Sequence, residues 1–313
     1  MSIVPASALG VLYPPNTISV HITDLCNSRC RFCGEASHGH KQDTVTRDSV
    51  MKFLEEHCTN DWTALNVHGG EPTISPFLSD VLHRARTLGV NWTILQTNAM
   101  RFRDIGFASD INAAGVDLYT VGFHGSSGKI MDSITGVVGA FDRALQGIRV
   151  ISRFNKAIRF TIVVCALNHH DLSGLVSLAA SEGVSHINIS AMQPGGSAAN
   201  DLEALLIPYS VASANIIEAV GLAITLGLNV TLEGFPYCAL KSQEAYQVDW
   251  AKQCLKVLYR DIIIEDFNKF LTATIRSYGP PCVHCTKRED CSGVYKEYIN
   301  RYGWSEFHSY ESE

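Results

Sequence analysis

One short pattern recurs along this chain: a helical stretch ends in glycine, and an apolar run follows at once. The pattern occurs at Gly89, Gly115, Gly183 and Gly227. Glycine just past a helix can adopt a positive φ angle and cap the last carbonyl groups of that helix. A helix, a glycine and then a buried strand is how an α/β unit returns to its sheet. The pattern therefore predicts an α/β fold.

The apolar runs predict strands that alternate with helices. The strands, rich in Val, Ile, Thr and aromatic residues, are expected at 18–23, 64–68, 92–96, 118–123, 160–165 and 187–191. Helices are expected near 46–58, 76–88, 105–114, 138–152 and 171–182. Such alternation implies a parallel sheet with right-handed crossovers. Six strands of this kind make a partial or full barrel, or an open doubly wound sheet.

Composition and charge exclude several classes of protein. The 313 residues are 46% hydrophobic, enough for a sizeable core, and carry a net charge of -6 without a basic block. Nucleic acid is therefore not an expected partner, because phosphate binding needs clustered Lys and Arg. The longest apolar stretch, 219–230, is shorter than the roughly 20 residues of a membrane span. The N-terminus also lacks the features of a secretion signal, so we expect a cytoplasmic protein with no membrane partner.

The ten cysteines are unevenly placed. A protein without an export signal sits in a reducing compartment, where disulfides are rare, so clustered thiols indicate metal ligation or catalysis. Cys26, Cys30 and Cys33 follow the first expected strand with the spacing C-x3-C-x2-C. Three thiolates on one loop can bind three corners of an iron–sulfur cubane and leave one iron open to a ligand. Zinc is the alternative metal, with His38 or His40 as a fourth ligand.

The motifs that follow arrive in an order that resembles the radical S-adenosylmethionine (SAM) superfamily. Cys26, Cys30 and Cys33, with the aromatic Phe32 before the last cysteine, look like the cluster loop of that family. Each later motif lies at the carboxyl end of an expected strand, the edge where parallel α/β folds bind ligands. In order, these motifs are His68-Gly69-Gly70-Glu71-Pro72, which is similar to the family's GGEP segment, Gln96-Thr97-Asn98, Gly122-Phe123-His124-Gly125, Asn168 and Met192.

The resemblance implies a fold, cofactors and a chemistry. The fold is a partial (β/α)6 TIM-like barrel over residues 14–232. Cys26, Cys30 and Cys33 would hold a [4Fe–4S] cluster whose open iron binds SAM, and an electron donor such as flavodoxin or ferredoxin would reduce it. Reductive cleavage of SAM gives a 5′-deoxyadenosyl radical, which takes a hydrogen atom from the substrate. The GGEP segment would hold the methionine amino group. The expected cofactor contacts are Phe32, Gly69, Gly70, Glu71, Pro72, Thr97, Asn98, His124, Asn168 and Met192.

A second group of cysteines lies near the C-terminus with the spacing C-x2-C-x5-C. It resembles the auxiliary-cluster region called SPASM, or twitch in its shortened form, in a small second domain expected at 233–313. Tyr295 stands where a full SPASM region has a further cysteine, which argues for one auxiliary [4Fe–4S] cluster rather than two. A four-cysteine zinc site is the alternative. The expected ligands are Cys282, Cys285, Cys291 and, as the fourth, Cys238 before Cys254.

Cys254 is also a candidate hydrogen-atom donor. A redox-neutral epimerisation needs one hydrogen removed from one face of a carbon and another returned from the opposite face, and a thiol has a weak S–H bond. The overall plan is similar to aminoglycoside radical epimerases, which act in antibiotic biosynthesis, and the acidic balance suits a small cationic substrate. Glu35, Arg159 and Glu233 are candidate substrate contacts. Radical modification of a ribosomal peptide is the alternative function, and a non-catalytic iron–sulfur or zinc protein is the alternative of another class.

Overall fold

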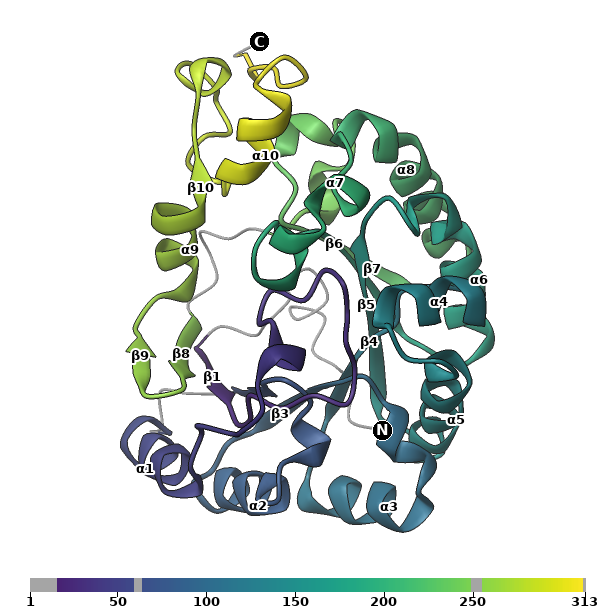
Figure 1. The fold of residues 1–313 in the computed structure, drawn as a ribbon, viewed down its shortest axis with the longest axis vertical. Helices are drawn as coiled ribbons and strands as arrows, with labels where there is room; N and C mark the ends of the chain where they lie inside the picture. Colours follow the sequence, from purple (N-terminus) through teal and green to yellow (C-terminus); the bar gives the residue numbers. More distant parts are fainter. Residues whose placement is uncertain (1–15, 59–63, 249–254, 312–313) are drawn as a thin grey trace.

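A nine-stranded sheet organises the chain, and the computed structural model describes residues 16–58, 64–248 and 255–311. The strand order is β7-β6-β5-β4-β3-β2-β1-β8-β9, so the described sheet is open rather than closed into a full barrel (Figure 1). The strands are β1 (Thr17–His21), β2 (Ala64–His68), β3 (Trp92–Thr97), β4 (Leu118–Gly122), β5 (Ala157–Val164), β6 (His186–Ala191), β7 (Asn229–Glu233), β8 (Leu255–Tyr259) and β9 (Ile262–Ile264).

Strands β1 to β7 are all parallel, and helices connect them. Figure 1 shows these helices in an arc around the sheet, so the predicted partial (β/α) barrel is confirmed. The strand β7, which is not among the expected six, follows the glycine turn at Gly227. None of the described helices is both long and apolar enough to span a membrane. The connecting helices are α1 (Arg47–His57), α2 (Leu78–Thr87), α3 (Ile105–Ala114), α4 (Gly128–Thr135), α5 (Ala140–Ser152), α6 (Leu172–Ser181), α7 (Leu202–Leu205) and α8 (Tyr209–Thr225).

The alternation of side chains along β1 shows how the two faces of the sheet differ. Ile18 and Val20 are fully buried in the apolar core that the helices share. Successive side chains of a strand point to opposite faces, so Ser19 and His21 point to the other side of the sheet. Ser19 Oγ accepts a 2.7 Å hydrogen bond from Asn66 Nδ2 on β2. The outer face of the barrel is therefore apolar and packs on helices, whereas the inner face carries polar side chains.

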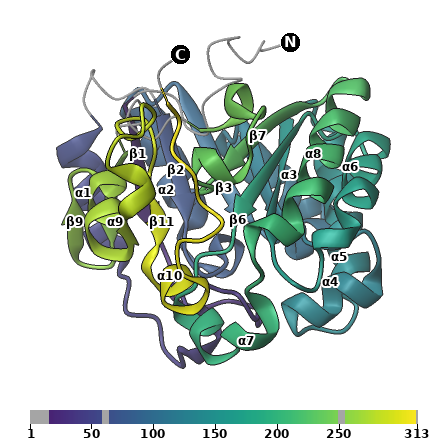
Figure 2. The same cartoon turned by 90° about the horizontal axis from the view of Figure 1, so that it is seen from above.

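The chain after β7 first extends the sheet and then forms a small cysteine-rich unit. β8 pairs parallel to β1, and β9 pairs antiparallel to β8. Figures 1 and 2 show α10 beside α7, and Tyr302 Oη donates a 2.8 Å hydrogen bond to the Leu206 carbonyl. The expected domain boundary after residue 232 precedes β8 and β9, which belong to the main sheet. This boundary stays a prediction. The last elements are α9 (Phe267–Ile275), β10 (Arg276–Ser277), β11 (Val294–Tyr295) and α10 (Lys296–Tyr302).

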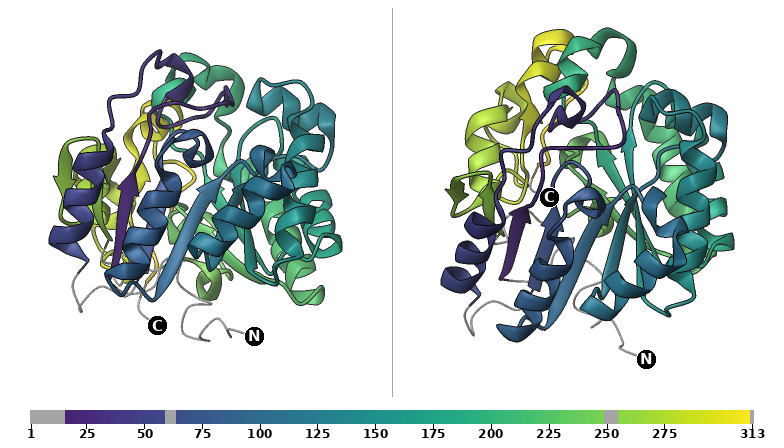
Figure 3. Two further views of the ribbon diagram at one scale, coloured as in Figure 1. Left: turned by 90° about the horizontal axis from the view of Figure 1, so that it is seen from below. Right: turned by 60° about the horizontal axis from the view of Figure 1, so that its bottom comes forward.

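The long loop between β1 and α1 lies across the carboxyl ends of the strands, as Figure 3 shows. Its course is fixed by backbone hydrogen bonds at two places. The Arg29 N–H donates to the Thr135 carbonyl at the end of α4 over 2.8 Å, and the Cys33 carbonyl accepts from the Ser197 N–H after β6 over 2.8 Å. The loop is therefore held on both sides of the barrel mouth, at positions next to or within its group of three cysteines.

Candidate active site

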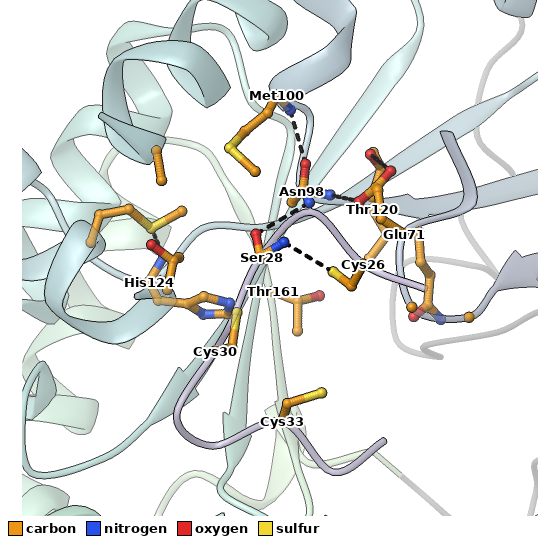
Figure 4. Close-up of a pocket in the computed structure, with 18 of the residues that line it drawn as sticks. Cys26, Ser28, Cys30, Cys33, Glu71, Asn98, Met100, Thr120, His124 and Thr161 are labelled. Atoms are coloured by element: carbon orange, nitrogen blue, oxygen red, sulfur yellow. Dashed lines mark hydrogen bonds between the residues drawn. The ribbon is translucent and has the colours of Figure 1, made fainter. Parts of the chain in front are cut away.

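The cysteines of this loop face a cavity of about 320 Å³ at the mouth of the barrel. Cys26, Cys30 and Cys33 line one side of it, and Figure 4 shows their sulfur atoms around the space that Glu71 and His124 also border. The remaining walls come from the segments that follow β2, β3 and β4 and from the inner face of the strands. Motifs that lie far apart in the sequence therefore meet in space.

Burial and mutual proximity decide the electrostatics of these thiols. Burial, followed by the charge of Glu71, raises the pKa of Cys26 to about 12. Burial, followed by the charges of Cys33 and Cys26, raises the pKa of Cys30. Such thiols give up their protons to metal ions that compensate the thiolate charge. No fourth cysteine among the described residues lines this cavity, so the donor set fits an iron–sulfur cluster with one open corner.

Two glycines let the segment after β2 approach the cysteine loop closely. A Cβ atom on Gly69, whose φ is 149°, would lie 2.6 Å from the Thr23 carbonyl oxygen. A Cβ atom on Gly70 would lie 2.0 Å from the Leu25 carbonyl oxygen. The Gly70 N–H instead donates a 2.7 Å hydrogen bond to the Thr23 carbonyl. The glycine pair is therefore required for contact between the two loops, whatever else it does.

The carboxylate of Glu71 joins the segments that follow β2 and β3. Its Oε1 accepts hydrogen bonds from the Thr73 N–H at 3.1 Å, the Thr73 hydroxyl at 2.6 Å and the Thr97 hydroxyl at 2.7 Å. Its Oε2 accepts one, from the Asn98 N–H at 2.7 Å. Oε1 thus accepts three donors and Oε2 only one, so Oε2 keeps a lone pair for a further donor, and Glu71 lines the cavity.

His124 presents one defined tautomer to the cavity. Its Nδ1 accepts a 3.3 Å hydrogen bond from the Val163 N–H, and burial lowers its pKa to about 3. The ring is therefore neutral at pH 7 and carries its proton on Nε2. The ring of Phe32 packs edge-on against it, with centroids 4.7 Å apart. The aromatic residue before the third cysteine thus fixes the histidine rather than facing the cavity.

Several residues expected to contact the cofactor do not line the cavity, and the structure shows other contacts for two of them. Asn168 is fully buried, and its Nδ2 donates to the carbonyls of His124 at 3.0 Å and Val163 at 2.9 Å. It ties the ends of β4 and β5 together. The role of these residues at the cofactor stays a prediction. They are Phe32, Pro72, Asn168 and Met192.

The inner face of the sheet supplies polar residues to the same cavity. Arg159 and Glu233, two of the candidate substrate contacts, are among them. Glu233 Oε2 accepts a 2.9 Å hydrogen bond from Asn188 Nδ2, and burial raises the pKa of Glu233. Several other lining residues were not predicted from the sequence, although polar residues at every second position of an apolar strand are the signal that marks those on the strands. These are Thr120, Thr161 and Asn188 from the strands and Ser28 from the loop.

The C-terminal cysteines surround a second, small cavity. Gly293 N–H donates to Cys291 Sγ, and Tyr310 N–H donates to Cys285 Sγ, each at 3.4 Å. Burial raises the pKa of Cys238 to about 11, with Cys291 and Cys282 adding to the effect. Four thiol groups around one cavity fit a closed four-ligand metal site. The lining cysteines are Cys238, Cys282, Cys285 and Cys291, which include the first choice for the fourth ligand.

The remaining candidates are placed as follows. Cys254 lies outside the described residues, so its role stays a prediction. Cys58 and Cys165 are buried in the apolar core. His40 is an alternative zinc ligand for the loop. Its Nε2 lies 3.0 Å from Nη2 of Arg260, and the residue does not line the cysteine cavity.

Comparison with known proteins decides the family. The sequence model of the radical SAM superfamily matches residues 20–179, from β1 into α6. The chain belongs to the radical SAM superfamily. This membership implies that the protein binds SAM and a [4Fe–4S] cluster. The matched segment contains the cysteine loop and the motifs after β2, β3 and β4, which are the parts that meet at the larger cavity.

The curated relatives that the chain matches include probable GTP 3′,8-cyclases. A probable GTP 3′,8-cyclase of Saccharolobus islandicus strain Y.N.15.51 is 24% identical over 184 residues, which are 58% of this chain and 59% of the relative. A probable GTP 3′,8-cyclase of Sulfurisphaera tokodaii is 21% identical over 187 residues, 59% of each chain. The chain thus spans less than two thirds of the length of these relatives.

Solved structures of radical SAM proteins share the fold. Streptococcus suis SuiB bound to SAM superposes with a TM-score of 0.68 at 14% identity, covering 97% of this chain and 78% of SuiB. The structure of anSMEcpe with bound AdoMet gives 0.57 at 14% identity, covering 70% of this chain and 64% of that one. Because the SuiB match covers nearly the whole chain, the shared fold extends into the cysteine-rich C-terminal unit.

Proposed function

We propose that this radical SAM enzyme cleaves SAM reductively and abstracts a hydrogen atom from a small cationic natural product. The observation that carries the proposal is the convergence of three thiols, Glu71, Asn98 and His124 on one cavity at the carboxyl ends of parallel strands. When bound, the [4Fe–4S] cluster supplies one electron to SAM, and the S–C5′ bond breaks to give the 5′-deoxyadenosyl radical. A flavodoxin or ferredoxin is the proposed source of that electron.

In this proposal the chain's own residues bind and orient the cofactors. Cys26, Cys30 and Cys33 hold three irons. The free lone pair of Glu71 Oε2 accepts a hydrogen bond from the SAM amino group, and Gly70 lets this segment approach the cysteine loop. Support for these roles comes from the donor set and from the fixed geometry of Glu71, whose Oε1 is already saturated.

The proposal also requires that solvent be kept from the radical. Met100 and Met131 line the cavity, and both are buried. The backbone N–H of His124 donates a 3.2 Å hydrogen bond to Met131 Sδ, which fixes the thioether in the wall. A closed, apolar wall limits quenching of a reactive intermediate by water or stray donors. These methionines exclude solvent in the proposed reaction and take no part in the chemistry.

We assign one auxiliary [4Fe–4S] cluster to the second cavity. Its proposed ligands are Cys238, Cys282, Cys285 and Cys291, which line that cavity together. The N–H groups of Gly293 and Tyr310 point at two of the sulfurs, and hydrogen bonds to sulfur tune the potential of such clusters. The C-terminal unit, 233–313 in the sequence analysis, is accordingly proposed as a SPASM- or twitch-like domain.

The proposed substrate class rests on charge. Glu233 sits on the cavity wall with its carboxylate held by Asn188, and the chain carries a net charge of -6. The positive charges of Arg276 and Arg159 already oppose the effect of burial on the pKa of Glu233, and a cation on the substrate would add to this pairing. An amine-bearing natural product, with the aminoglycosides as the leading example, would supply such a cation.

Epimerisation is the finer part of this proposal, with Cys254 as the donor of the returning hydrogen. Cys254→Ala should keep the iron of both clusters and still form 5′-deoxyadenosine, but should fail to give the epimer. A loss of about four irons would instead make Cys254 a cluster ligand. Unchanged product yield would reject the donor role.

A ribosomal peptide is the second candidate substrate. The supporting observation is the fold likeness to SuiB, which is also solved bound to its precursor peptide SuiA, with a TM-score of 0.67 over 97% of this chain. At 15% identity the likeness concerns the fold alone, so a peptide ranks below a cationic small molecule as the candidate substrate.

The test is anaerobic reconstitution with iron and sulfide, followed by reduction in the presence of SAM. We expect about eight irons per chain and release of 5′-deoxyadenosine, measured by mass spectrometry. The matched control is Cys30→Ala, which should keep the auxiliary irons and release none. A screen of aminoglycosides in deuterated buffer then tests the substrate class, since a returned solvent-exchangeable hydrogen appears as one deuterium in the product. Absence of 5′-deoxyadenosine from the reduced wild type would refute the proposal.

A further inference from the structure

A second group of metal-binding side chains lies beside the cysteine loop. His21 ends β1, His68 ends β2, and Glu35 follows the third cysteine. One donor atom from each of the three lies within 4.8 Å of the other two. None of the three belongs to the thiol sets assigned above.

The sheet brings the two histidines together. His21 and His68 are direct partners in the parallel ladder of β1 and β2, and their rings meet edge-on with centroids 5.5 Å apart. They share the inner face with Ser19 and Asn66, which are hydrogen-bonded to each other two residues earlier. The pair therefore faces the inside of the barrel.

Two buried polar atoms in this group have no hydrogen-bond partner. His21 is 1% exposed, yet its Nδ1 has none. Glu35 accepts a hydrogen bond from Tyr259, yet its Oε2 is buried and has none. Buried polar groups are nearly always paired, so each such exception needs an explanation. A ligand between the two side chains would supply one.

Asp24 fixes His21 in the form that a metal ion needs. Its Oδ1 accepts a hydrogen bond from His21 Nε2 at 3.1 Å and one from Arg260 Nε at 2.7 Å, and its Oδ2 accepts from the Thr44 N–H at 3.1 Å. With Nε2 as the donor, the lone pair of His21 is on Nδ1. A carboxylate that orients a ligating histidine in this way recurs at metal sites.

We propose that His21, His68 and Glu35 bind one divalent transition-metal ion. Two imidazole nitrogens and one carboxylate oxygen suit Zn²⁺, Mn²⁺, Fe²⁺ or Co²⁺. The ion fastens the end of the cysteine loop to β1 and β2, because Glu35 lies on the loop and the histidines lie on the strands. Three protein donors leave a further coordination position for water. This site is independent of the proposed reaction.

The test uses the reconstituted holoenzyme with Zn²⁺ as the probe. After anaerobic dialysis against micromolar Zn²⁺ and removal of loosely bound metal, we expect one zinc per chain at an unchanged iron content. Zinc K-edge X-ray absorption should show nitrogen and oxygen at about 2.0–2.2 Å and no sulfur at about 2.3 Å. Sulfur scattering would mean that zinc has entered a cysteine site and would overturn the proposal.

Two variants and one control complete the test. His68→Ala and Glu35→Gln should each lose the zinc while the iron content stays the same. His83→Ala, on the exposed surface of α2, should keep it. If His68→Ala fails to fold, Glu35→Gln decides, because it keeps the size of a loop side chain and removes only the charge. Zinc below 0.2 per chain in the wild type, or equal zinc in Glu35→Gln, would overturn the proposal.

Discussion

The backbone N–H of Asn98 donates a 2.7 Å hydrogen bond to Oε2 of Glu71, and this contact links the segments after β2 and β3 at the floor of the active-site cavity. Glu71 is 1% exposed, and burial raises its pKa. Its ionised form is opposed by that burial and supported by the hydrogen bonds it accepts from Thr73, Thr97 and Asn98. The carboxylate thus connects the two segments and is also a proposed contact for SAM.

Glu71→Gln should therefore damage both stability and SAM cleavage. The amide can accept on one side but turns an N–H group toward donors on the other, so at least one buried hydrogen bond is lost. We expect a fall of about 2 kcal/mol in the free energy of unfolding and a drop of tenfold or more in 5′-deoxyadenosine formation. Anaerobic urea unfolding and mass spectrometry measure the two effects. Wild-type values for both would contradict the assignment.

Gly70→Ala should expel the cluster held by the loop. The added methyl group would lie 2.0 Å from the Leu25 carbonyl oxygen, so the loop must move away from β2. We expect the loss of about four irons per chain, measured by mass spectrometry of the metal. The control is Gly221→Ala in α8, where nothing lies within 4 Å of the new Cβ. It should keep all the iron and gain roughly 0.5–1 kcal/mol of stability, because alanine favours a helix.

Cys238→Ala should remove the auxiliary cluster alone. Cys238 comes from the segment after β7, and the other cysteines of that cavity come from residues 282–291. A closed cluster that loses a ligand is labile, so we expect about four fewer irons and retained release of 5′-deoxyadenosine. Cys58→Ala, at a buried position outside both cavities, should leave the iron unchanged. Full iron content in Cys238→Ala would mean that another residue is the fourth ligand of the auxiliary cluster.

Much of the fold could be predicted because local sequence patterns mark its helices and strands. Gly115 ends α3 with a φ of 112°, and β4 follows after two residues, as the glycine pattern predicts. The apolar runs located six parallel strands. The pairing of β8 with β1 could not be predicted, because Thr17 and Leu255 are register partners 238 positions apart and no local pattern records that contact.

The site was predictable where residues cluster in sequence and less so where the fold assembles it. Cys26 and Gly70 stand in recognisable motifs, and both line the cavity. Asn188 is one of three polar residues that alternate with apolar ones in β6, and only the inward direction of its side chain brings it to Glu233. Asn168 shows the opposite case: its motif position suggested the cofactor, whereas its side chain holds two strand ends together.

His124 should make the protein less stable in acid. Burial lowers its pKa from 6.5 to about 3, so the unfolded chain binds more protons than the native one between these values. The contribution of His124 to the free energy of unfolding is therefore fully present above about pH 6.5. It is lost as the pH falls toward 3, by up to about 1.4 kcal/mol per pH unit. His124→Gln, which can still accept from Val163, should show a flatter loss between pH 7.5 and 5.5.

Anaerobic urea unfolding at several pH values measures this slope. His83→Gln, at an exposed position, serves as the control and should follow the wild type. The expected difference between His124→Gln and the wild type is confined to the window below pH 6.5. Parallel curves for all three proteins would show that His124 does not titrate as its burial requires.

Glu233→Gln should weaken binding of a cationic substrate. The substitution keeps an oxygen that can accept from Asn188 at the observed 2.9 Å, so the local geometry is retained while the negative charge is lost. A charge-assisted hydrogen bond to an ammonium group is worth about 1.5–3 kcal/mol, which predicts a rise in KM of roughly 10- to 100-fold. Glu203→Gln, exposed on α7, is the matched control and should bind normally.

The pairing also predicts ligand discrimination: an aminoglycoside acetylated at the contacting amine should bind the wild type and Glu233→Gln equally. Equal KM values for the free amine in both proteins would place the cation elsewhere in the cavity.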